Sequence, residues 1–171
     1  METVWMNLRD VDEAKGGVVL HETLALPRVA EENRMVERID PVTADLIAHK
    51  ADRLYHVDGA VETVIWYMCS RCLETFSAPL HLPFAEVFTR DAARVEDEII
   101  YAPDDDVLLD PFIEQTINLA IEYRPLCRED CKGLCPVCGK NRNLEPCDCN
   151  PRPVDPRWAA LQDLLSPDES E

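Results

Sequence analysis

Six of the chain's eight cysteines lie in one stretch, CREDCKGLCPVCGKNRNLEPCDC, which runs from Cys127 to Cys149. The other two, Cys69 and Cys72, form a CSRC pair much earlier in the chain. In a reducing compartment, paired CxxC spacings indicate metal or redox chemistry rather than structural disulfides. A shared metal would therefore tie the first part of the chain to the last.

The bulk composition predicts a cytoplasmic globular protein. Its 171 residues, 46% hydrophobic and 30% charged, suffice for one sizeable domain with a small metal-held appendage. No run approaches the roughly 18 apolar residues that a membrane helix needs. The N-terminal stretch METVWMNLRDVDEAKGG lacks the basic start and apolar block of a secretory signal. We therefore expect no membrane association.

The net charge of -17 excludes the class of protein that coats nucleic acid by long-range attraction. The charge is uneven, because residues 124–157 hold seven basic side chains against five acidic ones. Any phosphate contact there must come from a few well-placed groups. The expected contact residues for RNA or another partner are Arg128, Lys132, Lys140 and Arg142.

Alternating apolar residues predict strands in the first hundred residues, over 4–8, 18–26 and 42–48. Asp40-Pro41 signals a turn before the third, so a short helix at 42–48 is the alternative there. The segment RLYHVDGAVETVIWYMC predicts a hairpin with a tight turn at Asp58-Gly59. Its second half, residues 61–68, is apolar on both faces and is expected to be a central strand that delivers Cys69.

Two Asp-Pro pairs predict helix starts. Asp110-Pro111 opens a helix over 111–124 with Asp110 as its N-cap, and Asp155-Pro156 opens a shorter one. The predicted organisation is a β-body at 1–125, a cysteine-rich zinc module with a short C-terminal helix at 126–165, and a disordered acidic tail at 166–171.

The CPVCG stretch has the spacing of a metal-binding knuckle. A tight turn brings Cys135 and Cys138 together, its backbone N–H groups offset the thiolate charge, and Gly139 can take the positive φ that lets the chain leave. CSRC has the same spacing but is followed by Leu73, so a weaker knuckle is expected there.

Eight cysteines in four pairs predict two zinc sites of four thiolates each. The favoured grouping joins Cys135 and Cys138 to Cys147 and Cys149, because the loop between the pairs is short. The second site would then consist of Cys69, Cys72, Cys127 and Cys131. Two alternatives stay open: the two CxxC knuckles facing each other as in a zinc ribbon, or a single zinc site with four spare thiols.

Catalytic readings of the cysteines are less favoured. Cys131, Cys135 and Cys138 have the spacing of a radical-enzyme iron-sulfur site, but Val137 replaces the usual aromatic residue and too little chain follows for a catalytic barrel. A dithiol redox pair is expected in a strand-helix turn, whereas CSRC and CPVC follow predicted β-structure or lie in loops. A zinc deaminase needs a P-C-x-x-C pair, and the order here is C-P-x-C. Four-thiolate zinc sites are closed and therefore structural.

At CKGLCPVCGKNRNLEPCDC, followed by DPRWAALQDLL, the sequence resembles the YceD family, named large ribosomal RNA subunit accumulation protein. The resemblance extends through VDGAV, WYMCSRCLETF and YRPLCRED and covers about residues 15–165. It implies a non-enzymatic role in making or retaining large-subunit ribosomal RNA. The family has no established catalytic residues, so only the eight cysteines are mapped.

Together these observations predict an α+β fold: an antiparallel β-body of roughly five to seven strands with one packed helix, plus a zinc-bound cysteine-rich C-terminal module. The expected function is that of a cytoplasmic ribosome-biogenesis factor that binds large-subunit rRNA or a basic ribosomal protein, with no small-molecule substrate. A thiol-redox or metal-dependent enzyme and a zinc-ribbon adaptor in transcription are the alternatives.

Overall fold

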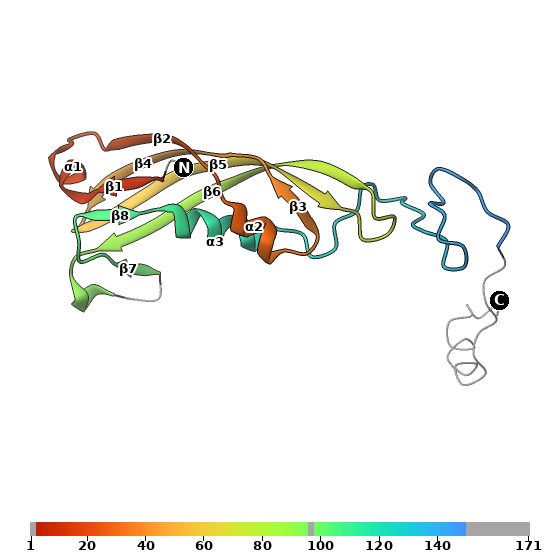
Figure 1. Ribbon diagram of the computed structural model, residues 1–171. Helices are drawn as coiled ribbons and strands as arrows, with labels where there is room; N and C mark the ends of the chain where they lie inside the picture. Colours follow the sequence, from red (N-terminus) through yellow and green to blue (C-terminus); the bar gives the residue numbers. More distant parts are fainter. Residues whose placement is uncertain (1–2, 96–97, 150–171) are drawn as a thin grey trace, which may run out of the picture.

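The computed structural model describes residues 3–95 and 98–149 (Figure 1). In chain order the elements are β1 (Trp5–Asn7), α1 (Leu8–Glu13), β2 (Val18–Leu24), α2 (Pro27–Glu32), β3 (Val36–Ile39), β4 (Val42–Ala51), β5 (Leu54–Met68), β6 (Thr75–Thr89), the 3-10 turn η1 (Ala92–Arg94), β7 (Ile99–Tyr101), β8 (Asp106–Leu108) and α3 (Asp110–Ala120). The predicted mixed α+β fold with a mostly antiparallel sheet is confirmed. The described part has three α-helices and eight strands, more than the one helix and five to seven strands expected there.

The main sheet has the strand order β2-β4-β5-β6-β7, and β3 also pairs with β5. All of its pairings are antiparallel except that of β6 with β7. Because β5 has β4 and β3 along one side and β6 along the other, the expectation that residues 61–68 lie in a central strand is confirmed. A small second sheet joins β1 to β8.

The predicted turn at Asp58-Gly59 is wrong. Strand β5 runs unbroken through Gly59, and the turn between β4 and β5 lies at Asp52 and Arg53, which have φ angles of 52° and 66°. Two positive φ angles are what a tight two-residue hairpin turn requires. Gly59 has a different purpose: an added Cβ would lie 2.1 Å from the carbonyl oxygen of Asp45, so the glycine permits close approach of β4.

The N-terminal strand is shorter than expected, because a helix begins within it. Residues 4–8 were predicted as one strand, but β1 ends at Asn7 and α1 starts at Leu8. The side-chain oxygen of Asn7 accepts hydrogen bonds from the backbone N–H groups of Arg9 and Asp10. This N-cap satisfies donors that have no partner within the helix, and it explains the switch from strand to helix.

Helix α3 starts at Asp110, one residue before the predicted start, and ends at Ala120 rather than at residue 124. Asp110 does not cap it. The carboxylate of Asp110 instead accepts a hydrogen bond of 2.7 Å from the backbone N–H of Val4, which joins the helix start to the N-terminal segment. Ile121 is already extended, so the chain leaves the helix well before Pro125.

The hydrophobic core lies between one face of the sheet and the helices (Figure 1). Ile113 and Ile117 of α3 and Val29 of α2 are fully buried in it. Phe112 of α3 meets Phe88 of β6 edge to face, with ring centroids 5.2 Å apart. This core contains none of the cysteines, so the β-body has its own source of stability.

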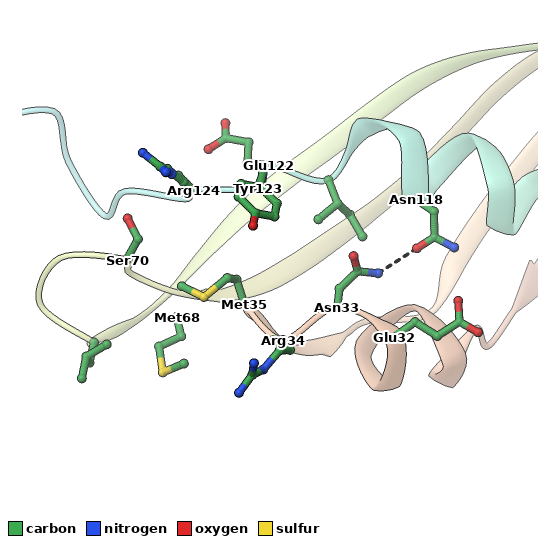
Figure 2. Close-up of a pocket in the computed structure, with 12 residues that line it drawn as sticks. Glu32, Asn33, Arg34, Met35, Met68, Ser70, Asn118, Glu122, Tyr123 and Arg124 are labelled. Carbon is green, nitrogen blue, oxygen red and sulfur yellow. Dashed lines mark hydrogen bonds between the residues drawn. The ribbon is translucent and has the colours of Figure 1, made fainter.

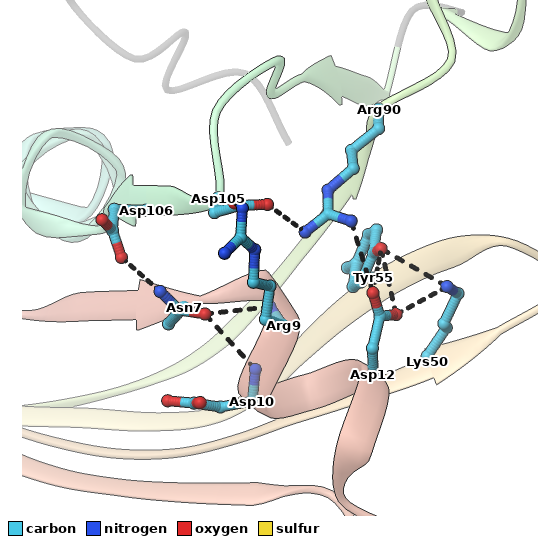
Figure 3. A network of polar contacts seen from close by, with 9 residues as sticks. All are labelled: Asn7, Arg9, Asp10, Asp12, Lys50, Tyr55, Arg90, Asp105 and Asp106. Atoms are coloured by element: carbon cyan, nitrogen blue, oxygen red, sulfur yellow. Dashed lines mark hydrogen bonds and ion pairs between the residues drawn. The ribbon is translucent and has the colours of Figure 1, made fainter.

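A polar network ties α1 to the sheet at the end away from the cysteines (Figure 3). Asp12 accepts hydrogen bonds from Lys50 at 2.6 Å and from the hydroxyl of Tyr55. Arg90 bridges Asp12 and Asp105. These contacts hold a short helix whose own hydrogen bonds would not keep it in place.

The cysteine-bearing segment extends beyond the end of β5 and β6, away from the helices (Figure 1). The division between a body at 1–125 and a module at 126–165 stays a prediction. The helix expected at Asp155-Pro156 and the tail at 166–171 lie outside the described residues. Among the helices that the structure does describe, none is long and apolar enough to cross a membrane.

Candidate metal centres

The CSRC pair forms the loop that joins β5 to β6. Cys69 directly follows β5, and its N–H donates to the carbonyl of Glu74 just before β6 begins. The N–H of Leu73 donates to the carbonyl of Cys69 at 3.0 Å, and Leu73 has a φ of 62°. The long hairpin therefore presents both thiols of the pair at its tip.

The CPVCG knuckle repeats this geometry. The N–H of Gly139 donates to the carbonyl of Cys135 at 2.9 Å, and the φ of Gly139 is 74°. Backbone N–H groups of Cys138 and Val137 lower the pKa of Cys135 to about 6, as the turn geometry predicted. Leu73 takes the conformation expected of a glycine, so the two knuckles share one fold.

The first cluster, defined by Cys69, Cys72, Cys127 and Cys131, has its four sulfur atoms within 4.8 Å of one another. The Sγ atoms of Cys69 and Cys131 are 3.8 Å apart, and those of Cys72 and Cys127 are 3.7 Å apart. Four sulfurs bound to zinc at about 2.3 Å in a tetrahedron lie about 3.8 Å apart. A disulfide would need a separation of about 2 Å. The donor set therefore fits a tetrahedral metal ion.

Thiol pKa values in the first cluster are pushed in opposite directions. Burial raises the pKa of Cys69, but backbone hydrogen bonds from Cys127, Cys72 and Arg71 outweigh it and bring the value to about 6. Burial and the neighbouring sulfurs raise the pKa of Cys127 to about 12. Four thiolates cannot share this space without a compensating charge, which a divalent cation supplies.

The second cluster consists of Cys135, Cys138, Cys147 and Cys149, again with all sulfurs within 4.8 Å. It is more open than the first, since Cys138 is exposed and only Cys135 is buried. The hydrogen-bonded thiol of Cys138 and burial raise the pKa of Cys149 to about 12. The structure thus brings the eight cysteines together in the favoured grouping. The alternative, in which the two CxxC knuckles share one site, is not the arrangement found.

The two clusters are joined by Asn143, which the sequence reasoning missed. Its amide Nδ2 donates to Sγ of Cys131 at 3.3 Å, and its Oδ1 accepts from the N–H of Lys132 at 2.8 Å. Asn143 lies between Cys138 and Cys147, so a loop of the second cluster supports a ligand of the first. No local sequence pattern marks such a long-range contact.

The knuckle of the second cluster also packs directly on the CSRC loop. The N–H of Leu134 donates to the carbonyl of Arg71 at 3.0 Å. Gly133 has a φ of 67°, and an added Cβ would lie 2.9 Å from the same carbonyl oxygen. The backbone contact holds residues 133–134 against the tip of the β5–β6 hairpin.

The four predicted contact residues are all exposed, but they differ in their partners. Arg128 pairs with Asp130 at 3.4 Å, and Lys140 pairs with Glu145 at 3.1 Å. Lys132 and Arg142 have no ion-pair partner among the described residues, and Arg142 lines a small hollow beside the second cluster. Their role in binding stays a prediction.

Comparison with known proteins places these features in a family. Residues 57–165 match the family described as large ribosomal RNA subunit accumulation protein YceD. An uncharacterized protein of Mycobacterium tuberculosis is 30% identical over 155 residues, covering 87% of this chain and 74% of that protein. An uncharacterized protein of Bacillus subtilis is 28% identical over 151 residues, covering 86% and 88%.

A plant protein from Zea mays, large ribosomal RNA subunit accumulation protein YCED homolog 1, chloroplastic, is 26% identical over 179 residues. These cover 85% of this chain and 57% of the plant protein. No solved structure matches. The family match spans β5 from Val57 onward, β6, α3 and all eight cysteines, and the chain therefore belongs to the YceD family.

Proposed function

We propose that the protein is a non-enzymatic ribosome-biogenesis factor that supports the accumulation of large-subunit ribosomal RNA. It acts in the cytoplasm, binds that RNA or a basic ribosomal protein, and takes no small-molecule substrate. The family match and the name of the plant relative support the ribosomal part of this proposal. The two cysteine clusters support a structural metal as its basis.

The proposed metal is zinc, two ions per chain, held by the first and second clusters. The observation that carries this is the separation of 3.7–3.8 Å between sulfurs of the first cluster. Thiolate donors favour zinc among the divalent metals available in cells, and four protein ligands leave no open position for a substrate. A closed site supports a structural role and is the reason we assign no catalytic one.

The clusters would hold residues 127–149 rigidly on the β5–β6 hairpin. When bound, zinc offsets the charge of the thiolates, although two four-thiolate sites still take the net charge from -17 to about -21. Such an acidic body suits a basic ribosomal protein, whereas Lys132 and Arg142, which have no ion-pair partner in the described part of the chain, suit RNA phosphates.

Depletion of the protein in cells tests the ribosomal role. The expected result is a fall in the ratio of large-subunit to small-subunit rRNA, restored by the wild-type chain. Recovery of the tagged protein from lysate at moderate salt should bring down a ribosomal component. Unchanged rRNA ratios together with no ribosomal component in the pull-down would refute the proposal.

Native mass spectrometry tests the metal. We expect two zinc ions per chain, with Cys69→Ser and Cys147→Ser each losing a different one. All eight thiols should resist alkylation until a chelator is added. A chain that carries no zinc and alkylates freely would contradict the structural-metal part while leaving the rRNA result to stand on its own.

A further inference from the structure

A groove of about 850 Å³ lies beside the first cluster, where three segments meet (Figure 2). The N–H of Met68, at the end of β5, donates to the carbonyl of Met35 before β3. The N–H of Ser70 donates to the carbonyl of Pro125 after α3. These bonds hold the α2–β3 connection and the chain after α3 against the CSRC loop, so the groove has fixed walls.

Unpaired positive charge collects at this end of the molecule. Most basic side chains of the β-body have acidic partners, such as Arg90 with Asp12 and Asp105. Among residues 3–95 and 98–149, the basic residues without an ion-pair partner are Lys15, Arg34, Arg53, Arg71, Arg124, Lys132 and Arg142. All of these except two, Lys15 and Arg53, lie in or next to the segments that form the groove and the clusters.

Arg34 and Arg124 line the groove itself and are exposed. Figure 2 shows them on separate segments, with Met35 between them in this view. Of the two acidic residues in the lining, Glu32 already pairs with Arg28 at 2.8 Å, which leaves Glu122. The groove therefore offers two unpaired cations against one unpaired carboxylate, on a protein whose net charge is -17.

The same groove also exposes two large side chains, Tyr123 and Leu73. Tyr123, beside Arg124, is 87% exposed. Leu73 is 54% exposed and has a φ of 62°, a conformation that costs a leucine energy and that the surrounding loop must hold. An exposed aromatic ring next to unpaired arginines is the arrangement that single-stranded nucleic acid recognises, by stacking a base and pairing its phosphates.

We propose that this groove binds a single-stranded segment of RNA, with phosphates at Arg34 and Arg124 and a base stacked on Tyr123. The inference rests on the proposed function and selects between its two partners. A basic ribosomal protein would bring its cations against Arg34 and Arg124, which disfavours it at this surface. RNA instead meets two arginines that have no ion-pair partner among residues 3–95 and 98–149.

Fluorescence anisotropy of the zinc-loaded full chain with a labelled single-stranded RNA of mixed sequence, about 10 nucleotides long, tests this site. The double variant Arg34→Gln, Arg124→Gln is compared with Lys15→Gln, Arg53→Gln, whose residues lie in the α1–β2 and β4–β5 connections. Figure 1 shows both connections at the other end of the sheet. Both double variants remove two positive charges and replace each residue by glutamine, so they differ only in the place of the change. The groove variant should bind roughly tenfold or more weakly, and the control within about twofold of wild type.

Salt dependence separates local contacts from the long-range field. Loss of two phosphate contacts should lower the slope of log affinity against log salt by about 1.4, at about 0.7 per phosphate of a single strand. Tyr123→Ala should weaken binding without changing that slope, and Tyr123→Phe should restore it, since the ring stacks and the hydroxyl does not.

Equal losses in the two double variants would show a general charge effect and overturn the groove as the site. So would absence of RNA binding by the wild type, or binding of an acidic peptide in preference to RNA. The rRNA ratio in depleted cells is measured separately. If depletion lowers the rRNA ratio but the chain does not bind RNA, the groove alone is rejected. If the chain binds RNA but the rRNA ratio is unchanged and the pull-down holds no ribosomal component, the proposed function is rejected.

Discussion

At the scale of single residues, Asn143 lies between ligands of the second cluster in sequence but supports Cys131, a ligand of the first. Burial raises the pKa of Cys131, and hydrogen bonds, that from the Asn143 amide first, outweigh it and leave the pKa lowered. A donor to a thiolate also orients it as a ligand, and loss of such a partner typically weakens metal binding by about 10–100-fold.

We predict that Asn143→Ala weakens zinc binding at the first cluster by about tenfold although all eight cysteines remain. Competition with a chromophoric chelator measures this. Leu144→Ala, an exposed neighbour in the same loop, is the matched control and should bind as the wild type does. Equal affinities in both variants would mean that the bond from Asn143 to Cys131 has no effect on the metal.

The ionised side chain of Asp12 makes the stability of the fold depend on pH. Its pKa is lowered by the hydrogen bond from Lys50, against the opposing effect of burial, and by Tyr55. A lowered pKa in the folded state means that the carboxylate stabilises the fold above its unfolded pKa, near 3.8, and that this stability is lost as pH falls through the folded pKa. Asp12→Asn should thus cost roughly 1 kcal/mol at pH 7 and progressively less in acid.

Urea unfolding of wild type and Asp12→Asn near pH 7 and near pH 3 checks this difference. Asp10→Asn, in the same helix but without an ion-pair partner in the described part of the chain, should change the free energy of unfolding by no more than about 0.5 kcal/mol at either pH. A cost for Asp12→Asn that is unchanged in acid would contradict the assigned charge interaction.

At the scale of elements, β5 shows what the sequence could predict and where it misled. Tyr55, Val57, Val61 and Ile65 are all buried, and this alternation continues without a change of phase through Gly59. The period-2 pattern was therefore the reliable signal, whereas Asp-Gly is only a local preference for a turn. The close approach of β4 that demands Gly59 depends on a strand pairing, which no local window contains.

Gly59→Ala tests this role. Because the added methyl would lie 2.1 Å from the carbonyl oxygen of Asp45 in β4, the sheet must shift, and we expect a loss of about 1–3 kcal/mol in the free energy of unfolding. In Gly16→Ala the methyl would meet no atom within 4 Å, and stability should change by less than about 0.5 kcal/mol. Denaturant unfolding compares the two; similar losses would point to glycine flexibility rather than to close approach.

At the scale of the whole molecule, the cysteine grouping could be predicted because short loops close at little entropic cost, as between Cys138 and Cys147. The residues that surround the clusters could not. Arg34 and Arg124 come from separate segments and line one groove with residues of the β5–β6 hairpin tip, while Asn143 reaches Cys131 from a loop of the second cluster. Periodicity and spacing describe neighbours in sequence, and these contacts are long-range.

The separation of the core from the clusters leads to a prediction about metal removal. The hydrophobic core is built from the sheet and helices, and the cysteines form their own small cluster at the hairpin tip. Residues 127–149 contain short backbone links and few buried apolar side chains, so their order depends on the metals. Chelation should therefore release this segment while the sheet stays folded.

Limited trypsin digestion with and without a strong chelator measures this. Cleavage should appear after Arg128, Lys132, Lys140 and Arg142 only in the metal-free protein, while Arg28 and Arg38 in the body remain protected. Far-ultraviolet circular dichroism should retain its β signal, and added zinc should restore resistance. Loss of the whole sheet on chelation would contradict this prediction. It would show that the hydrophobic core is stable only while the metals hold the hairpin tip in place.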